Sequence, residues 1–176
     1  MFGLNDTPEG TDVLDLLKQD HRQVDDLFEE YEALKGDGAN RAKGELAARI
    51  CDALSVHAAV EEEIFYPAVR KADAETRDLV SEAAVEHQSL KDIISRLQAA
   101  PVTDPLYDAG VKVLSEYVKH HVKEEENELF PRVRKMDLDR EALGQKVLER
   151  KAELERKART PDVTRNGGAR RAMART

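Results

Sequence analysis

The residues of this sequence best able to do chemistry are its histidines. The chain has only five, and four of them fall on predicted helices at positions where apolar residues recur every three or four places. Two of the four are followed by a glutamate four residues later, which puts an imidazole and a carboxylate on one helix face, one turn apart. The candidate metal ligands are therefore His21, His57, Glu61, His87, His121 and Glu125.

Four imidazoles and two carboxylates would make a poor apolar core, because an unpaired buried carboxylate is strongly disfavoured. Two divalent cations would supply the missing partner, with each glutamate bridging both ions and the histidines filling terminal positions. Mixed nitrogen and oxygen ligation with four imidazoles suits iron, manganese or zinc rather than calcium or magnesium. We therefore predict a two-metal site, with two non-haem iron ions as the first expectation and manganese or zinc still open.

An internal duplication supports this set. Residues 54–71 align without gaps with residues 118–135, and this register matches one His-x-x-x-Glu motif with the other and Pro67 with Pro131. The other two candidate histidines, His21 and His87, precede the histidines of the two motifs by 36 and 34 residues. The first two helices thus resemble the next two as a pair.

The periodicity predicts an all-α fold, because apolar residues recur at helical spacing in four segments. Short connections between them favour an up-down-up-down four-helix bundle. Thr11 is the expected N-cap of the first helix, Gly36 to Gly38 its end, and Asp104 with Pro105 the start of the fourth. The predicted helices span about 11–35, 40–71, 75–99 and 104–135.

A weaker apolar stripe predicts a fifth helix after the bundle. The last residues carry five arginines and one aspartate with almost nothing to bury, so we expect a basic, disordered tail. The chain then divides into an N-terminal lead (1–10), the bundle (11–136), a C-terminal helix (137–158) and the tail (159–176).

Composition narrows the class of protein. The formal net charge is -8, which argues against a folded nucleic-acid binder and predicts good solubility. Cys51 is the single cysteine, so no intramolecular disulfide can form, and its expected role is that of a small buried apolar residue. The N-terminus lacks the features of a signal peptide, and no apolar run approaches the length of a membrane span. We therefore expect a cytoplasmic protein.

Taken together, these motifs resemble the hemerythrin-like proteins with the HHE cation-binding domain. The resemblance rests on a single histidine in each of the first and third helices, on H-x-x-x-E followed by F-Y-P, and on a second H-x-x-x-E followed by L-F-P. It covers about residues 14–135. It implies a four-helix bundle with a carboxylate-bridged di-iron centre that meets dioxygen, peroxide or nitric oxide.

One position departs from the oxygen-carrying members of that family, which have a second histidine one turn after the helix-three histidine. Lys91 stands there in this chain. With four histidines rather than five, both metals would keep an open position, which favours peroxide-consuming, catalase-like or peroxidase-like chemistry over reversible oxygen carriage. The alternative is an iron-sensing or iron-holding module without turnover, and a metal-free structural bundle is a third hypothesis.

Residues near the ligands are candidates to support them. A tyrosine one turn before His121 could hydrogen-bond within the site, acidic neighbours of the bridging glutamates could relay protons, and an aspartate one turn after His21 could support a ligand or pair with Lys91. His120 points away from the site and is expected at the surface. Pro67 and Pro131 are expected to end or kink their helices. The supporting candidates are Tyr117, Asp25, Glu62 and Glu124.

Overall fold

The structure, a computed structural model, describes residues 11–34 and 39–159, and the regular structure in these ranges is all helical. The prediction of an all-α fold is confirmed. The second and fourth long helices each contain a five-residue π-helical segment, labelled η1 and η3. The elements are α1 (Val13–Ala33), α2 (Asn40–Val60), η1 (Glu61–Phe65), α3 (Tyr66–Ala72), the 3-10 turn η2 (Ala74–Thr76), α4 (Arg77–Ala99), α5 (Tyr107–Glu124), η3 (Glu125–Leu129), α6 (Phe130–Val133) and α7 (Arg140–Arg159).

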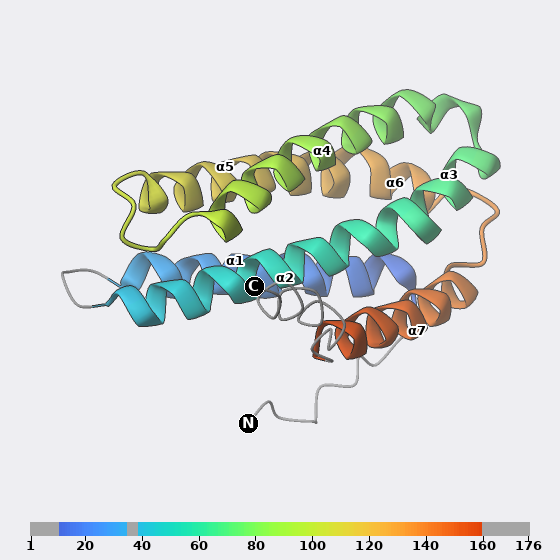
Figure 1. Cartoon of the computed structure of the whole chain (residues 1–176). Coiled ribbons are helices and arrows are strands. Elements are labelled where there is room, and N and C mark those ends of the chain that lie inside the picture. The colour runs from blue at the N-terminus through green and yellow to red at the C-terminus, as the bar shows by residue number, and fades with distance from the viewer. Residues whose placement is uncertain (1–10, 35–38, 160–176) are drawn as a thin grey trace, which may run out of the picture.

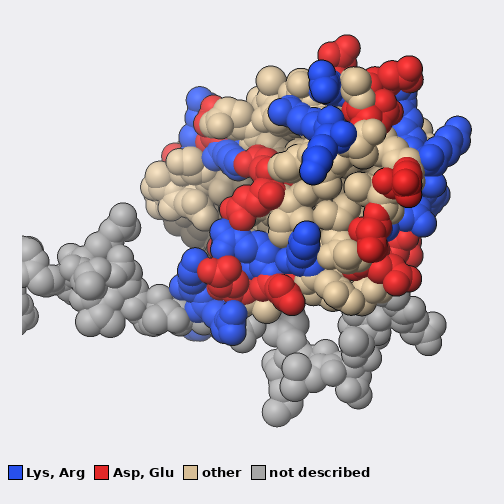
Figure 2. Space-filling view, turned by 90° about the vertical axis from the view of Figure 1, so that its right-hand side faces the viewer, with Lys and Arg blue, Asp and Glu red and all other residues tan. Residues whose placement is uncertain are grey.

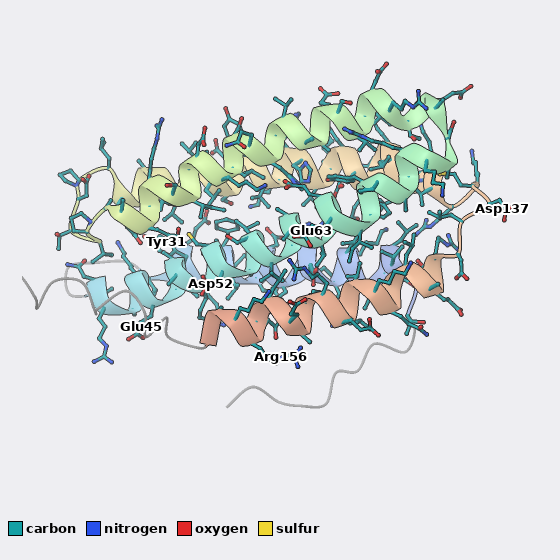
Figure 3. All side chains as sticks on the ribbon, turned by 45° about the vertical axis from the view of Figure 1, so that its right-hand side comes forward. Tyr31, Glu45, Asp52, Glu63, Asp137 and Arg156 are labelled. Atoms are coloured by element: carbon teal, nitrogen blue, oxygen red, sulfur yellow. The ribbon has the colours of Figure 1, made fainter. Side chains whose placement is uncertain are left out.

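The long helices form two hairpins that pack on one another. Figure 1 shows α1 beside α2 and α4 beside α5, with the chain reversing between successive long helices. The fifth helix, α7, lies outside this bundle against α1 and α2. Side chains fill the space between the helices, as Figure 3 shows.

The apolar core consists of two clusters, one at each end of the bundle. One contains Phe28, Ile50 and Leu114, and the other contains Phe65 and Phe130. Every candidate ligand histidine stands in the sequence between a residue of one cluster and a residue of the other. The six candidate ligands therefore occupy a polar layer between two apolar ones.

Helix starts differ from the prediction by a few residues. The N-cap of α1 is Asp12 rather than Thr11, because the Asp12 carboxylate accepts a hydrogen bond from the backbone N–H of Leu14 at 2.9 Å. Helix α5 begins at Tyr107 rather than at 104–105, and the Asp104 carboxylate accepts from the N–H of Leu106 ahead of the helix. Gly36–Gly38, residues 1–10 and the tail beyond Arg159 lie outside the described residues.

Neither proline ends its helix, so that part of the prediction is wrong. Pro67 and Pro131 follow the two π-helical segments directly, at the start of α3 and α6. A proline inside a helix lacks one N–H and crowds the carbonyl four residues earlier. The preceding turn widens instead of breaking, as the N–H of Tyr66 donates to the carbonyl of Glu61, five residues back. Such π turns are frequent at functional sites.

No helix within 11–34 and 39–159 is long and apolar enough to cross a membrane. The cytoplasmic location stays a prediction.

Two glycines give a matched test of how α7 packs. A methyl group on Gly144 of α7 would overlap the backbone carbonyl of Thr11, whereas one on Gly44 of α2 would meet only Val102, at 3.9 Å. We expect Gly144→Ala to lower the free energy of unfolding by about 1–3 kcal/mol through overpacking. Gly44→Ala should instead raise it by about 0.5–1 kcal/mol, because alanine favours a helix over glycine. Denaturant unfolding of the full chain measures both, and equal effects would contradict this packing of α7.

Candidate metal centre

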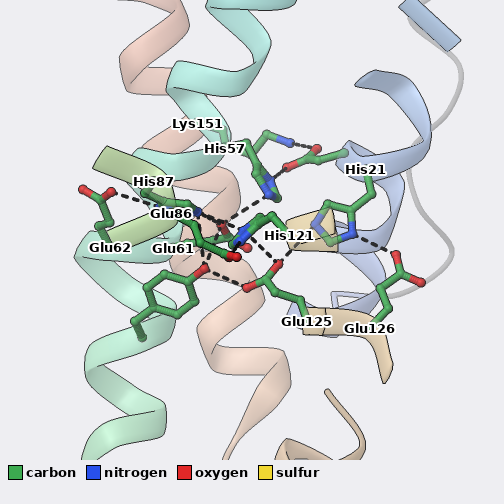
Figure 4. Close-up of polar contacts among 12 residues, drawn as sticks. His21, His57, Glu61, Glu62, Glu86, His87, His121, Glu125, Glu126 and Lys151 are labelled. Atoms are coloured by element: carbon green, nitrogen blue, oxygen red, sulfur yellow. Dashed lines mark hydrogen bonds and ion pairs between the residues drawn. The ribbon is translucent and has the colours of Figure 1, made fainter. Parts of the chain in front are cut away.

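The six predicted ligands converge on one buried layer of the bundle. His21 lies on α1, His57 and Glu61 at the junction of α2 and η1, and His87 on α4, while the remaining two lie at the junction of α5 and η3. None of the six is more than 6% exposed, and Glu61 is fully buried. Figure 4 shows their side chains directed toward one another from four helices.

The imidazoles form two pairs. The rings of His21 and His57 have centroids 4.8 Å apart, and those of His87 and His121 are 4.7 Å apart. Each pair offers two Nε2 atoms to the interior, as the terminal ligands of one metal ion would.

Each carboxylate lies between the two pairs. Glu61 Oε2 is 3.2 Å from His57 Nε2 and 3.3 Å from His87 Nε2. Glu125 Oε2 is 3.4 Å from His21 Nε2 and 3.6 Å from His121 Nε2. Each carboxylate therefore lies within reach of a cation that would bind beside either pair.

Several buried polar atoms of this layer have no hydrogen-bond partner, as is expected of atoms that would bind a cation. Among the described residues, four buried side-chain atoms lack a hydrogen-bond partner, and all four belong to the predicted ligands: His21 Nε2, His57 Nε2, Glu61 Oε1 and Glu125 Oε2. Buried polar atoms are nearly always paired, so each such exception calls for an explanation. Two groups of residues could each hold a metal ion, because their ligand atoms lie within 4.8 Å of one another. The first group is these four residues, and the second is Glu61 with His87 and His121.

The outer nitrogen of every candidate ligand histidine contacts a carboxylate, which leaves Nε2 facing inward. The Nδ1 contacts are His21 with Glu126 at 2.8 Å, His57 with Asp20 at 3.3 Å, His87 with Glu62 at 3.0 Å and His121 with Glu86 at 2.7 Å. The pattern follows the duplication. Asp20 and Glu86, which directly precede His21 and His87, each contact the other candidate histidine of the same hairpin. Glu62 and Glu126, which directly follow Glu61 and Glu125, each contact a histidine of the other hairpin.

Tyr66 is a site residue that the sequence analysis did not single out. Its hydroxyl donates to Glu125 Oε1 at 2.7 Å and lies 3.4 Å from both Glu61 Oε2 and His87 Nε2. The duplication places Phe130 at the equivalent position in the second half, where its ring stacks on His21 with centroids 6.0 Å apart. This difference between the two aligned motifs was the available signal.

Comparisons with known proteins agree with this geometry. The hemerythrin HHE cation binding domain family matches residues 12–133. The chain belongs to this family. A solved structure, the HHE cation binding domain-containing protein that is the Rv2633c homolog from Mycobacterium kansasii, aligns with a TM-score of 0.68 and 23% identity. The alignment covers 82% of this chain and 87% of the solved chain, and at 23% identity it shows the shared fold.

A curated relative, a DNA nickase from Nostoc sp., is 29% identical over 124 residues, which is 69% of this chain. The chain spans about a third of that relative's length, since the match covers 33% of it.

Of the four residues predicted to support the ligands of this HHE domain, Glu62 contacts a candidate ligand in the structure, His87. Tyr117 is 48% exposed on α5, and none of the hydrogen bonds described for the buried layer involves it. Asp25 lies 3.7 Å from Lys119 at the surface, and Glu124 lies 3.1 Å from the exposed His120, so neither reaches the buried layer.

Three further expectations concern residues around the site. Lys91 pairs with Glu62 at 2.6 Å rather than with Asp25. The side chain of His120 is 63% exposed, and Cys51 is buried in the apolar core. Burial raises the pKa of the Cys51 thiol to about 11.

The two carboxylates of the HHE site have opposite pKa shifts. Burial and the negative charge of Glu125 raise the pKa of Glu61 well above its ordinary value. Burial acts on Glu125 too, but the neighbouring imidazoles of His21 and His121 outweigh it and lower that pKa to about 2.

Burial lowers the pKa of His57 to about 4 and also lowers that of His87. Burial has the same effect on His21 and His121, but hydrogen bonding to carboxylates outweighs it and raises both pKa values. Because metal ligands must be deprotonated, cations entering this site would displace protons from it.

A small cavity lies next to the four imidazoles. It leaves about 20 Å³ for the centres of water-sized molecules, and its remaining walls include Leu54, Leu90, Ile94 and Val118. A space of this size holds one or two water-sized molecules. The HHE centre therefore faces an apolar cavity that admits only a very small ligand.

Two adjacent histidines provide a matched test of metal ligation. We expect His121→Ala to lose most bound metal, because it removes an inward imidazole and empties the space beside Glu61. His120→Ala should keep the metal, because that side chain lies at the surface. Elemental analysis of both purified variants measures metal per chain, with helical circular dichroism to verify folding. Equal metal content in the two folded variants would refute the ligand set.

Proposed function

We propose that this HHE domain holds two iron ions and uses them to bind or consume a small oxidant, with hydrogen peroxide first and dioxygen or nitric oxide as related ligands. The observation that carries the proposal is the pair of buried carboxylates, each in contact with one histidine of either pair. Bound iron would supply Lewis acidity and an electron reservoir. Disproportionation of two peroxide molecules to one dioxygen and two waters needs no outside reductant.

The residues of the chain contribute orientation, exclusion and proton handling. Carboxylates on Nδ1 hold each imidazole with Nε2 inward. Apolar walls around the cavity keep bulk water and larger substrates away from the centre. The hydroxyl of Tyr66 is a proton donor in contact with both carboxylates, at 2.7 Å from Glu125 and 3.4 Å from Glu61. Burial raises its pKa well above the ordinary value, so the phenol keeps its proton.

Tyr66 also makes the two proposed metal positions unequal. It lies beside the His87 and His121 pair, while the other pair has the apolar ring of Phe130. An open position at each metal stays a prediction, and the two positions would have different neighbours. A phenol oxygen is available at one of them only.

The alternative is a module that senses or holds iron without turnover. The buried ligand set joins all four long helices, so bound metal would stabilise the folded bundle over the unfolded chain by mass action. A partner could then read the ordered state. The DNA nicking of the Nostoc relative is not extended to this chain, whose face in Figure 2 intersperses acidic and basic side chains and whose net charge is -8.

Iron analysis followed by peroxide addition separates these functions. We expect about two irons per chain, a near-ultraviolet charge-transfer band and peroxide consumption. His57→Ala should lose at least one of the irons, together with the band and the peroxide consumption. A large thermal shift on iron loading without peroxide turnover would favour the holding module instead. Full peroxide consumption by iron-free protein would reject the first proposal.

A tyrosine pair tests the role of the phenol. Tyr66→Phe should keep the iron, because no predicted ligand is removed, but should slow peroxide consumption by about ten-fold or more, as loss of a positioned proton donor does. Tyr31→Phe is the control, since its hydroxyl bonds Asp108 at 2.8 Å, outside the site. Stopped-flow absorption of the iron-loaded variants measures the rates, and unchanged rates in Tyr66→Phe would contradict this role.

A further inference from the structure

The four carboxylates that support the histidines have unequal surroundings. Asp20 and Glu86 are equivalent by the duplication, each preceding a candidate ligand and supporting the histidine of its hairpin partner. The Glu86 side chain is 18% exposed and faces the surface residue His120. The Asp20 side chain is only 9% exposed, and a helix outside the duplicated bundle covers it.

That helix is α7, and its Lys151 contacts Asp20 directly. The ammonium of Lys151 donates to Asp20 Oδ1, while Oδ2 of the same carboxylate lies 3.3 Å from His57 Nδ1. Figure 4 shows Lys151 above His57, on the outer side of the site. One carboxylate thus connects a cation of α7 to a candidate metal ligand.

Polar contacts carry much of the docking of α7. Leu143 and Val147 are buried in its first half, where Gly144 meets the start of α1. Farther along, a cavity of about 290 Å³ opens beside Lys151 between α7 and the bundle. Arg150 forms two contacts, of 2.7 and 3.0 Å, with Glu63, which Figure 3 labels.

Other lysines contact supporting carboxylates, but from within the bundle. Lys91 of α4 pairs with Glu62 and is 42% exposed, and Lys18 of α1 lies 3.6 Å from Glu126. The side chain of Lys151 is 20% exposed, and its carboxylate is the most buried of the three. A buried carboxylate depends strongly on its cation, because removing one partner of a buried pair leaves an uncompensated charge.

We propose that Lys151 is a positioning residue that acts through Asp20 on His57, so that the docking of α7 is coupled to metal retention at the His21 and His57 position. The proposal rests on ligation of metal by His57, as proposed above. A ligand histidine held by an oriented carboxylate binds metal more tightly, and losing such a partner costs 10–100-fold in affinity. Undocking of α7 would weaken one of the two positions and leave the other pair, which α7 does not support, intact.

Two adjacent residues of α7 allow a matched test in the full chain. Lys151→Met removes the contact to Asp20, and Arg150→Met removes a contact between α7 and η1 without touching Asp20. Ferrous iron affinity is measured without oxygen by competition with a chelator, together with metal per chain and thermal unfolding of the metal-free protein. We expect Lys151→Met to weaken one of two ions at least ten-fold. Arg150→Met should stay within about three-fold of the unmodified chain for both ions, because Lys151 keeps its contact with Asp20 in that variant.

The outcomes separate the two proposals. Equal iron affinities in Lys151→Met and Arg150→Met would overturn the role of Lys151, while an unmodified chain that binds no iron would overturn the proposed function itself. Should Lys151→Met not fold, Asp20→Asn replaces it, with the same expected loss of one ion. Lys151→Arg keeps the cation and should restore affinity. Undiminished affinity for both ions in Asp20→Asn would refute the coupling.

Discussion

Burial of two carboxylates in the middle of a helical bundle is the constraint around which the rest of the structure is arranged. A carboxylate transferred from water to an apolar interior is costly unless charge and hydrogen bonds compensate it. Glu61 and Glu125 are 0% and 3% exposed, and four imidazoles surround them. Apolar clusters lie on either side of this layer, so protons or cations within the site are the nearest sources of compensating charge. The raised pKa of Glu61 reflects this cost of burial, which bound cations would offset.

Helical periodicity sufficed to place the ligands, because each His-x-x-x-Glu motif ends where the π-helical segment begins. His57 and Glu61 still obey regular α-helical spacing. Tyr66 does not, since five residues along an α-helix turn a side chain about 140° away from Glu61. The widened turn ahead of Pro67 returns Tyr66 to the site, and no rule based on 3.6 residues per turn anticipates this. Tyr117 shows that regular spacing can also suggest a contact that is not made. It lies about one turn from His121, but about 60° around the helix from the buried Leu114, and so falls at the rim of the bundle.

The supporting carboxylates show a second limit of sequence reasoning. The acidic runs around Glu61 and Glu125 contain several equivalent candidates, and the choice among them depends on how the helices cross. Glu62 supports a histidine of another helix, whereas Glu124 contacts only its surface neighbour His120. Contacts between helices, rather than spacing within one, decide these roles. The fifth helix illustrates the same point, as its apolar stripe is weak and its docking depends on pairs such as Arg150 with Glu63.

The lysine that replaces a fifth histidine acquires a role from this arrangement. Lys91 lies one turn after His87, but its ammonium turns outward to pair with Glu62, whose Oε1 contacts His87 Nδ1 at 3.0 Å. Lys91 thus contacts the carboxylate that supports a candidate ligand. On the opposite side of the site, Lys151 holds the carboxylate of Asp20 in a similar chain of contacts, although it comes from α7. The duplication therefore repeats the same set of candidate ligands in both halves of the bundle. The surroundings of the two halves differ, because one has Tyr66 where the other has Phe130, and because Lys91 lies on α4 whereas Lys151 lies on α7. Two metal positions with equal ligands but unequal neighbours can differ in affinity and in access, and such a difference would let one ion be held firmly while the other meets the small molecule.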